Sequence, residues 1–430
     1  MKTVTFSHRP RRRALAAIAA MVATAGLQVG CAHHRGDHRM HARGATPISA
    51  ERLDRIAPVM KQQIDANAFP GAVSLLARDG RVVHLQAHGW QDAAKTKPMQ
   101  TDAIFRLASM TKPIVTTAAM MLVEQGRMQL NDPITRWLPE FADVKVETPQ
   151  GVVAPTRPVS VQDLMRHTSG LVYSGSTASP QIRDAYRRDN IESGEVDISA
   201  DDMLRGLGKI PLAHQPGTFW EYGVSTDVLG LLIQRVAGKR LDLLLDEMLL
   251  RPLGMTDTAF WVPPDKAARL AEALDSDPQK ATLLKAYRID RAPTDGGYLK
   301  GGAGLVGTAS DYLKFAQMIA NGGQFEGRRY LSAKVIDFML SDHTLGMGGT
   351  TQATTGPGYG FGLGFGIRSH PGMNWVPGSV GDATWSGAWG TTFWIDRQER
   401  LVGILMTQGP STRVPSRMLY RTLVYGAVGG

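Results

Sequence analysis

The chain has 430 residues, of which 43% are hydrophobic and 20% charged, a length that favours two lobes over a single core. Its formal net charge of +9 is concentrated in the first 50 residues, where eight basic residues stand against one acid. The rest of the chain carries 40 basic and 38 acidic groups. Such a nearly neutral body gives no support to a nucleic-acid-binding surface.

The basic N-terminus has the pattern of an export signal. Four arginines precede an apolar run from Ala14 to Val22, and small residues around Ala25 suit a cleavage site. We therefore expect a signal peptide over residues 1–30, a disordered tether over residues 31–48, and a periplasmic or secreted protein. Cys31, the only cysteine, offers lipidation and a membrane tether as the alternative to cleavage after Ala25. A single cysteine excludes an internal disulfide.

Strand patterns lie near both ends of the remaining chain, residues 49–430, with helical patterns between them. A hairpin is predicted for residues 72–89, because Asp79-Gly80 between two apolar runs favours a type I′ turn. A second hairpin is predicted for residues 391–407, followed by a final helix from Ser416. This order predicts an α+β fold: an antiparallel β-sheet flanked by helices, with a mostly helical lobe inserted at about residues 146–290.

Serine residues mark the expected helix starts. An amphipathic helix is expected after Ser49, and Ser160, Ser199 and Ser225 each occupy the expected N-cap of a further helix. The run from residue 356 to residue 366 alternates glycine with apolar residues. It predicts a strand with one bare face rather than a nucleotide-binding loop.

Ser109 and Lys112 form a Ser-x-x-Lys motif at the start of an apolar helix expected over residues 109–125. Pro113 is tolerated only near a helix start, so the helix must begin close to Ser109. The spacing of three residues places the Lys112 amine within reach of the Ser109 hydroxyl. These residues alone leave two interpretations open: a nucleophile beside its activating amine, or a plain N-cap serine beside a surface lysine.

Six short motifs follow one another along the chain: Phe105 to Lys112, Leu164 to Leu171, Trp220 to Tyr222 with Asp227 to Gly230, Pro252 to Met255, Gly302 to Leu305, and Trp385 to Asp396. Together they resemble the serine β-lactamase-like and penicillin-binding-protein superfamily, with the class C β-lactamase fold, and most of all its family VIII carboxylesterases. The likeness covers about residues 50–410, and the ordered set is more specific than any one motif.

The resemblance implies a role for each matching residue. Ser109 would be the nucleophile, Lys112 its activator, and Tyr222 the carrier of the proton from Ser109 to the leaving group. The backbone N–H groups of Ser109 and Ala388 would form the oxyanion hole. A core tyrosine is the alternative for Tyr222, and a loop-holding role is expected for His167.

Trp385, Ser386, Gly387 and Val224 are expected to line the substrate-binding cleft. The lactamase branch carries Lys-Thr-Gly where this chain has Trp-Ser-Gly, and Tyr-x-Asn where this chain has Tyr-Gly-Val. Trp385 cannot meet a lactam carboxylate as an ammonium would, and Val224 offers no amide to a peptide-like side chain. We therefore expect a serine hydrolase that cleaves carboxylic esters or lactones through an acyl-enzyme.

Alternatives of two classes remain open. One is a β-lactamase, a D,D-carboxypeptidase or a D-aminopeptidase acting on cell-wall-like amides, and the other is a non-catalytic protein that binds cell-wall fragments. An α/β-hydrolase is disfavoured because no Gly-x-Ser-x-Gly occurs, and a metal enzyme because residues 49–430 have only six histidines. The expected partner is a small ester, lactone or lactam, with no nucleic acid, no metal and no cofactor.

Overall fold

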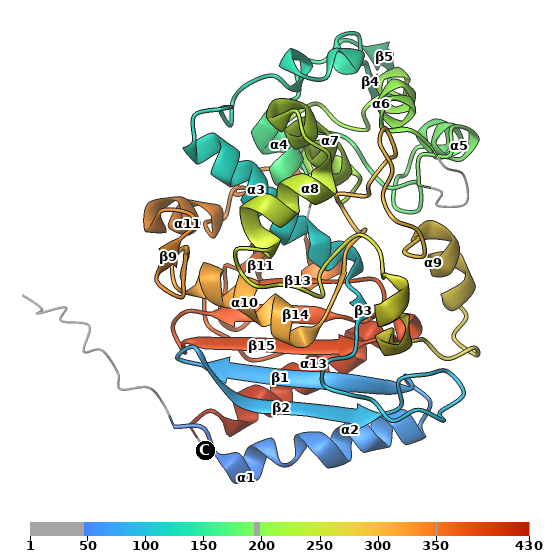
Figure 1. Ribbon diagram of the computed structural model, residues 1–430. Coiled ribbons are helices and arrows are strands. Elements are labelled where there is room, and N and C mark those ends of the chain that lie inside the picture. The colour runs from blue at the N-terminus through green and yellow to red at the C-terminus, as the bar shows by residue number, and fades with distance from the viewer. Residues whose placement is uncertain (1–46, 193–197, 350, 430) are drawn as a thin grey trace, which may run out of the picture. The chain divides into compact units, whose positions relative to one another are not determined.

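The structure is a computed structural model that describes residues 47–192, 198–349 and 351–429 (Figure 1). The expected signal peptide, the expected tether and Cys31 lie outside these ranges. None of the helices in these ranges combines the length and the apolar character that crossing a membrane requires.

A seven-stranded antiparallel sheet crosses the lower half of Figure 1. Its strands, in spatial order, are β11 (Tyr359–Phe361), β12 (Gly366–Arg368), β13 (Ala383–Ser386), β14 (Thr392–Asp396), β15 (Leu401–Thr407), β1 (Gly71–Arg78) and β2 (Arg81–Gly89). The N-terminal strand β1 lies between β2 and the C-terminal strand β15, with Ala72 opposite Thr407. The predicted antiparallel sheet, with strands from both ends of the chain, is confirmed.

Local turn chemistry sets the first hairpin as predicted. Asp79 and Gly80 both have positive φ, at 52° and 74°, which a type I′ turn requires of its two central residues. The expectation of one strand over residues 356–366 is wrong, because this run folds back on itself as β11 and β12. The turn between them is permitted by Gly364, whose φ is 85° and where a Cβ would come within 2.8 Å of Thr116.

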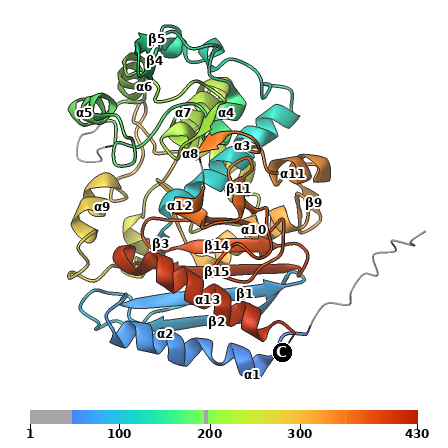
Figure 2. The same cartoon turned by 180° about the vertical axis from the view of Figure 1, so that it is seen from behind.

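Helices cover both faces of the sheet. On one face lie α1 (Ala50–Leu53), α2 (Ile56–Asp65) and α13 (Arg413–Ala427), and on the other lies α10 (Ala309–Ala320) (Figures 1 and 2). The predicted apolar stripe of the first helix is buried, although two non-helical residues divide the helix into α1 and α2. The final helix begins at Arg413, three residues earlier than predicted, because Pro415 sits in the first turn, where its missing N–H breaks no intrahelical bond.

The remaining helices gather mainly above the sheet in Figure 1. They are α3 (Thr111–Glu124), α4 (Val161–Met165), α5 (Pro180–Arg188), α6 (Ala200–Lys209), α7 (Ser225–Ala237), α8 (Leu241–Leu245), α9 (Lys280–Ala286), α11 (Ala333–Met339) and α12 (Gln352–Thr355). Short strand pairs join this region: β3 (Phe105–Arg106) with β7 (Val306–Gly307), β4 (Val146–Thr148) with β5 (Gly151–Val153), β6 (Phe219–Trp220) with β10 (Gly348–Gly349), and β8 (Gln324–Phe325) with β9 (Arg328–Arg329).

The serine caps were predicted with one error. Ser160 and Asp163 form the reciprocal capping box at α4, and Ser199 caps α6 by accepting from the Asp202 N–H at 3.0 Å. Ser225 is not a cap but the first residue of α7. Its hydroxyl is hydrogen-bonded instead to the hydroxyl of Ser169 at 2.9 Å, so a tertiary contact has taken the place of the local one.

Candidate active site

Ser109 lies at a sharp junction between a strand and a helix. The chain passes from β3 into a short 3₁₀ helix, Ala108–Met110, which leads directly into α3. Ala108 adopts a φ of 46°, a left-handed conformation that costs an alanine about 1 kcal/mol. This bend places Ser109 at the first turn, where unpaired backbone N–H groups favour negative charge.

Lys112 is fully buried, and three oxygen atoms accept hydrogen bonds from its ammonium group. They are the Ser109 hydroxyl at 3.4 Å, the Tyr173 hydroxyl at 3.1 Å and the Gly302 carbonyl at 2.7 Å. The ammonium also lies 4.7 Å from the ring centroid of Tyr222. Full pairing is what makes a buried cation tolerable, so the surface-lysine interpretation is excluded.

A buried carboxylate supports the Gly302 acceptor. Asp227, on α7, accepts the Gly302 N–H at 3.2 Å and the Tyr298 hydroxyl at 2.7 Å through the same oxygen. Asp227 is only 4% exposed. It therefore fixes the segment whose carbonyl accepts a hydrogen bond from Lys112, and it adds a negative charge near the buried amine.

Tyr222 is half-buried between β6 and α7 and is surrounded by rings. Its ring centroid lies 5.3 Å from that of Tyr173, 5.3 Å from that of Trp385 and 4.8 Å from that of His167. The Trp385 indole N–H donates to the Tyr222 hydroxyl at 3.4 Å. The structure thus brings Ser109, Lys112, Tyr222 and Trp385 into one cluster.

His167 contacts the chain on both sides of Tyr222. Its carbonyl accepts the Glu221 N–H at 3.0 Å, and its Nδ1 accepts the Gly223 N–H at 3.4 Å. Burial, and then the nearby Lys112 cation, hold the pKa of His167 well below its ordinary value. A neutral imidazole with these contacts positions the Tyr222 segment, as expected for a loop-holding residue.

The segment after β13 is tied to the segment before Ser109. Gly387 lies so close to the Leu107 carbonyl that an added Cβ would approach its oxygen to 2.2 Å. Thr391 donates its hydroxyl proton to the same carbonyl at 3.1 Å. Ala388 sits in the tight turn between them, so its backbone is held beside the start of the Ser109 helix.

The expected substrate-binding residues Trp385, Ser386 and Val224 line two different cavities. Trp385 is 1% exposed and faces Tyr222, whereas the Ser386 hydroxyl is paired with that of Thr392 at 2.7 Å. Val224 lines a cavity of about 150 Å³ together with Tyr173. A second cavity, of about 350 Å³, lies along β13 and α13.

Two functional candidates were missed by the sequence reasoning. Tyr173 follows the motif that ends at Leu171 by two positions, so an aromatic residue just beyond a matching motif was the available signal. Arg417 donates a hydrogen bond to the Gly387 carbonyl, and burial lowers the pKa of Arg417 to about 9. No local pattern relates an arginine on α13 to a glycine thirty positions earlier.

Among the residues that the structure describes, no group of three or more histidine, cysteine, aspartate or glutamate side chains is arranged to hold a metal ion. The chemistry available at this site is that of a hydroxyl nucleophile, an amine, a phenol and backbone N–H donors. This set is suited to acyl transfer.

Comparisons with known proteins identify the class to which this fold and site belong. The family model described as Beta-lactamase matches residues 56–425, and the chain belongs to this family. It is a serine hydrolase with a β-lactamase fold.

Individual relatives and a solved structure are also similar to this chain. Esterase EstB of Burkholderia gladioli is 32% identical over 84% of this chain and 91% of its own length. Protein Rv1367c of Mycobacterium tuberculosis is 34% identical over 83% of this chain and 90% of its own length. The solved structure of EstCE1, described as a hydrolase with promiscuous acyltransferase activity, is 29% identical with a TM-score of 0.73, and the match covers 89% of this chain and 98% of that one.

Proposed function

We propose that this protein is a carboxylesterase that cleaves carboxylic esters or lactones through an acyl-enzyme on Ser109. The observation that carries the proposal is the contact of the buried Lys112 ammonium with the Ser109 hydroxyl at 3.4 Å, on a helix start that also offers backbone N–H donors. The similarity to esterase EstB over most of both chains supports the same reaction class.

In the acylation step, Tyr222 acts as a phenolate and accepts the hydroxyl proton of Ser109 while Oγ bonds to the carbonyl carbon. The carbonyl electron pair moves onto oxygen, which the N–H groups of Ser109 and Ala388 stabilise. The Lys112 cation, 4.7 Å from the Tyr222 ring centroid, favours the charged phenolate. Collapse of the intermediate then expels the alcohol oxygen, which takes the proton from Tyr222.

Deacylation repeats these transfers with water. Tyr222 accepts a proton from the water molecule, the water oxygen bonds to the acyl carbon, and Ser109 leaves with the proton that Tyr222 returns. The products are a carboxylic acid and the free enzyme. No group outside the described cluster is needed to balance the reaction.

Trp385 and Val224 disfavour the lactamase and peptidase alternatives. Trp385 stands where an ammonium would meet a lactam carboxylate, and its N–H is directed to Tyr222. Val224 is 2% exposed and presents only methyl groups to the smaller cavity. A β-lactam or a D-alanyl peptide would leave polar groups unpaired at both positions.

A substrate panel tests the proposal. A p-nitrophenyl ester, a cephalosporin and a D-Ala-D-Ala peptide should be compared on one preparation, with Ser109→Ala as the control for background hydrolysis. We expect turnover of the ester alone, abolished by Ser109→Ala. Turnover of the peptide or the cephalosporin at the ester rate would favour the amide-cleaving alternatives, and binding without turnover would favour the non-catalytic one.

We also propose that the protein is exported to the periplasm or secreted. The support is the sequence of residues 1–30, with its arginines, apolar run and small residues. Intact-mass measurement of protein from the native host distinguishes a new N-terminus after Ala25 from a lipid-bearing Cys31. Full-length protein in the cytoplasm would contradict export.

A further inference from the structure

The larger cavity, of about 350 Å³, is lined by residues of β13, of the helix α13 and of the short helix α12; both helices face the viewer in Figure 2. Part of its wall is apolar, and its apolar lining residues include Trp375, Val376, Trp385, Trp394, Val414 and Met418.

One residue connects this cavity to the reacting atoms. Trp385 lines the cavity, and its indole N–H donates to the Tyr222 hydroxyl at 3.4 Å. In the proposed reaction, Tyr222 gives its proton to the departing alcohol oxygen. The alcohol part of the ester must therefore lie next to Trp385, and the space that opens there is the larger cavity.

The smaller cavity is lined by a different set of residues and has a different character. Its 150 Å³ are lined by Tyr173, Val224, Glu192, Asp227 and Lys300, among others. Because Tyr173 accepts a hydrogen bond from the same ammonium that contacts Ser109, this cavity adjoins the acyl carbon. Its small volume and polar side chains suit a short acyl group.

We propose that the larger cavity is the binding site for the alcohol part of the substrate, and that the enzyme selects esters of small acids with bulky, mainly apolar alcohols. This inference rests on the proposed esterase function and specifies its substrate class. The hydroxyl groups that line the cavity need no ligand, because Ser386 and Thr392 are hydrogen-bonded to each other at 2.7 Å and Thr384 donates to the Phe393 carbonyl at 2.6 Å. An apolar occupant thus leaves these hydroxyl groups paired.

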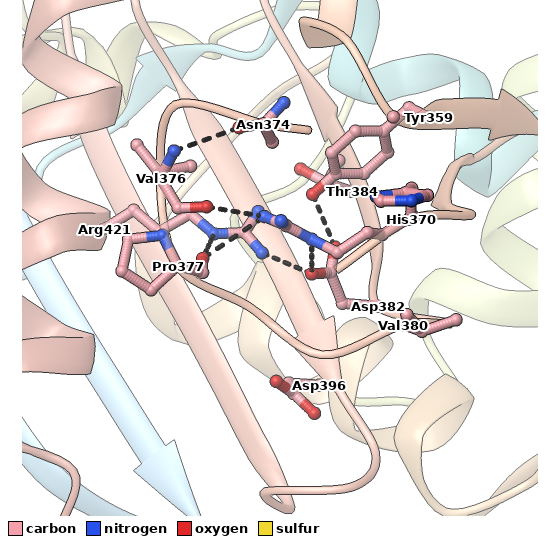
Figure 3. A network of polar contacts seen from close by, with 12 residues as sticks. Tyr359, His370, Asn374, Val376, Pro377, Val380, Asp382, Thr384, Asp396 and Arg421 are labelled. Atoms are coloured by element: carbon pink, nitrogen blue, oxygen red, sulfur yellow. Dashed lines mark hydrogen bonds and ion pairs between the residues drawn. The ribbon is translucent and has the colours of Figure 1, made fainter. Parts of the chain in front are cut away.

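The outer wall of the cavity is held rigidly by a buried ion cluster (Figure 3). Arg368 and Arg421 both bond to Asp382, at 2.7 Å and 2.5 Å. Arg368 also donates to the carbonyls of Val376 and Pro377, at 3.0 Å and 3.2 Å, and Arg421 donates to that of Pro377 at 3.1 Å. The segment between β12 and β13 is thereby fixed although it has no regular secondary structure.

This anchoring presents Trp375 at the cavity mouth. On its N-terminal side, Asn374 donates to the carbonyls of Thr355 and Pro357, at 3.1 Å and 3.0 Å. Trp375 itself is 64% exposed, and Val414, which also lines the cavity from α13, is 51% exposed. A fixed, exposed indole at the mouth of an apolar cavity is a stacking surface for an aromatic or bulky alcohol.

A pair of isomeric esters tests the assignment directly. In 2-naphthylmethyl acetate the bulky group is the alcohol, and in methyl 2-naphthylacetate the same atoms place it in the acid. We expect kcat/KM to be about 100-fold higher for the acetate, the size of discrimination that pocket fit provides. Equal values, or a preference for the methyl ester, would overturn the assignment while leaving the esterase function intact.

Variants at the mouth of the larger cavity test whether this cavity causes the preference for 2-naphthylmethyl acetate. Trp375→Ala should raise KM for 2-naphthylmethyl acetate about tenfold, with little change for the methyl ester. Val414→Trp, which fills the cavity mouth from an exposed helix position, should also lower kcat/KM for the acetate alone. Phe338→Ala is the matched control, because Phe338 is an aromatic residue of 42% exposure that does not line the cavity.

Binding to an inactive enzyme separates the two proposals. Calorimetric titration of Ser109→Ala with 2-naphthylmethyl acetate should give binding that Trp375→Ala weakens about tenfold. If the active enzyme hydrolyses neither isomer but this binding persists, the esterase proposal fails and the cavity assignment stands. If the binding does not depend on Trp375, the cavity assignment is overturned, whatever the enzyme hydrolyses.

Discussion

The Lys112 ammonium donates a hydrogen bond to the Tyr173 hydroxyl at 3.1 Å while facing the ring of Tyr222 at 4.7 Å. Two tyrosines therefore flank one cation, and either could serve as the base. Burial, together with the neighbouring Tyr222 and Asp227, raises the pKa of Tyr173 well above its ordinary value. Tyr173 therefore stays protonated and accepts a hydrogen bond from Lys112 through its hydroxyl oxygen, which supports the proposal that Tyr222 is the base.

The first prediction compares the two tyrosines. Tyr222→Phe should lower kcat on p-nitrophenyl acetate about 10²–10⁴-fold, the usual loss for a general base. Tyr173→Phe removes one hydrogen bond of Lys112 and should cost about tenfold. Steady-state kinetics on both variants show which tyrosine is the base. A larger loss for Tyr173→Phe would transfer the role of base to Tyr173.

A second prediction concerns the nucleophile and its amine. A fluorophosphonate probe should label Ser109 and no other serine, because the Ser109 hydroxyl lies 3.4 Å from the buried Lys112 ammonium at a helix start. Lys112→Ala should slow the labelling at least as strongly as Tyr222→Phe, since it also removes the charge that favours the phenolate. Peptide mapping with time-resolved intact mass measures both effects. A label on another serine would contradict the mechanism.

These residues show what sequence reasoning reached and where it stopped. Ser109, Lys112 and Tyr222 could be proposed because they belong to short motifs, and the first hairpin because Asp79-Gly80 determines its turn locally. Ser225 was misassigned because its choice between a cap and a contact with Ser169 depends on a distant segment. Tyr173 was missed because its hydrogen bond with Lys112 also joins two segments that are distant in the sequence.

The two cavities could not be predicted for a related reason. The mouth of the larger one depends on Arg368 and Arg421, which meet Asp382 from different elements, and no sequence spacing relates their side chains. The glycine-rich run also shows the limit of a periodicity argument. Its alternation was interpreted as one strand, whereas the tight approach at Gly364 that folds the run into a hairpin is a tertiary contact.

The third prediction concerns stability below neutral pH. Burial, and then the nearby His84, lower the pKa of His88 to about 4. In the unfolded chain its pKa is about 6.5. Between these values the unfolded state binds a proton that the native state does not. The contribution of His88 to the free energy of unfolding should therefore fall by about 1.4 kcal/mol per pH unit from pH 6.5 down to pH 4, and it should be independent of pH above pH 6.5.

Urea unfolding from pH 7 to pH 4.5 measures this slope. His88→Gln can keep a hydrogen bond to Ser74, which lies 2.8 Å from the imidazole, but cannot be protonated, so the variant should show a flatter dependence. His370→Gln, at an exposed position, is the control and should follow the wild-type curve. Parallel curves for wild type and His88→Gln would contradict the prediction.

The last prediction concerns substrate class. Short esters need only the nucleophile, the proton carrier and the oxyanion donors, whereas a β-lactam also presents a carboxylate and a side-chain amide. Trp385 offers no cation to the carboxylate, and Val224 offers no partner to the amide, so these groups would be desolvated without compensation. We therefore expect kcat/KM for a p-nitrophenyl ester to exceed that for a cephalosporin by about 10³ or more.

Substitutions of Trp385 should show whether this residue causes the difference in kcat/KM between the ester and the cephalosporin. Trp385→Lys should narrow the difference in kcat/KM between the ester and the cephalosporin. Its main effect should be lower ester turnover, because the indole N–H that orients the Tyr222 hydroxyl at 3.4 Å is lost. In addition, the new cation favours the lactam carboxylate. Trp385→Phe is the matched control, since it removes the same N–H without adding charge. It should lower ester turnover without improving lactam turnover. If wild-type enzyme turned over nitrocefin and the p-nitrophenyl ester with comparable efficiency, the lactamase alternative would replace the esterase one.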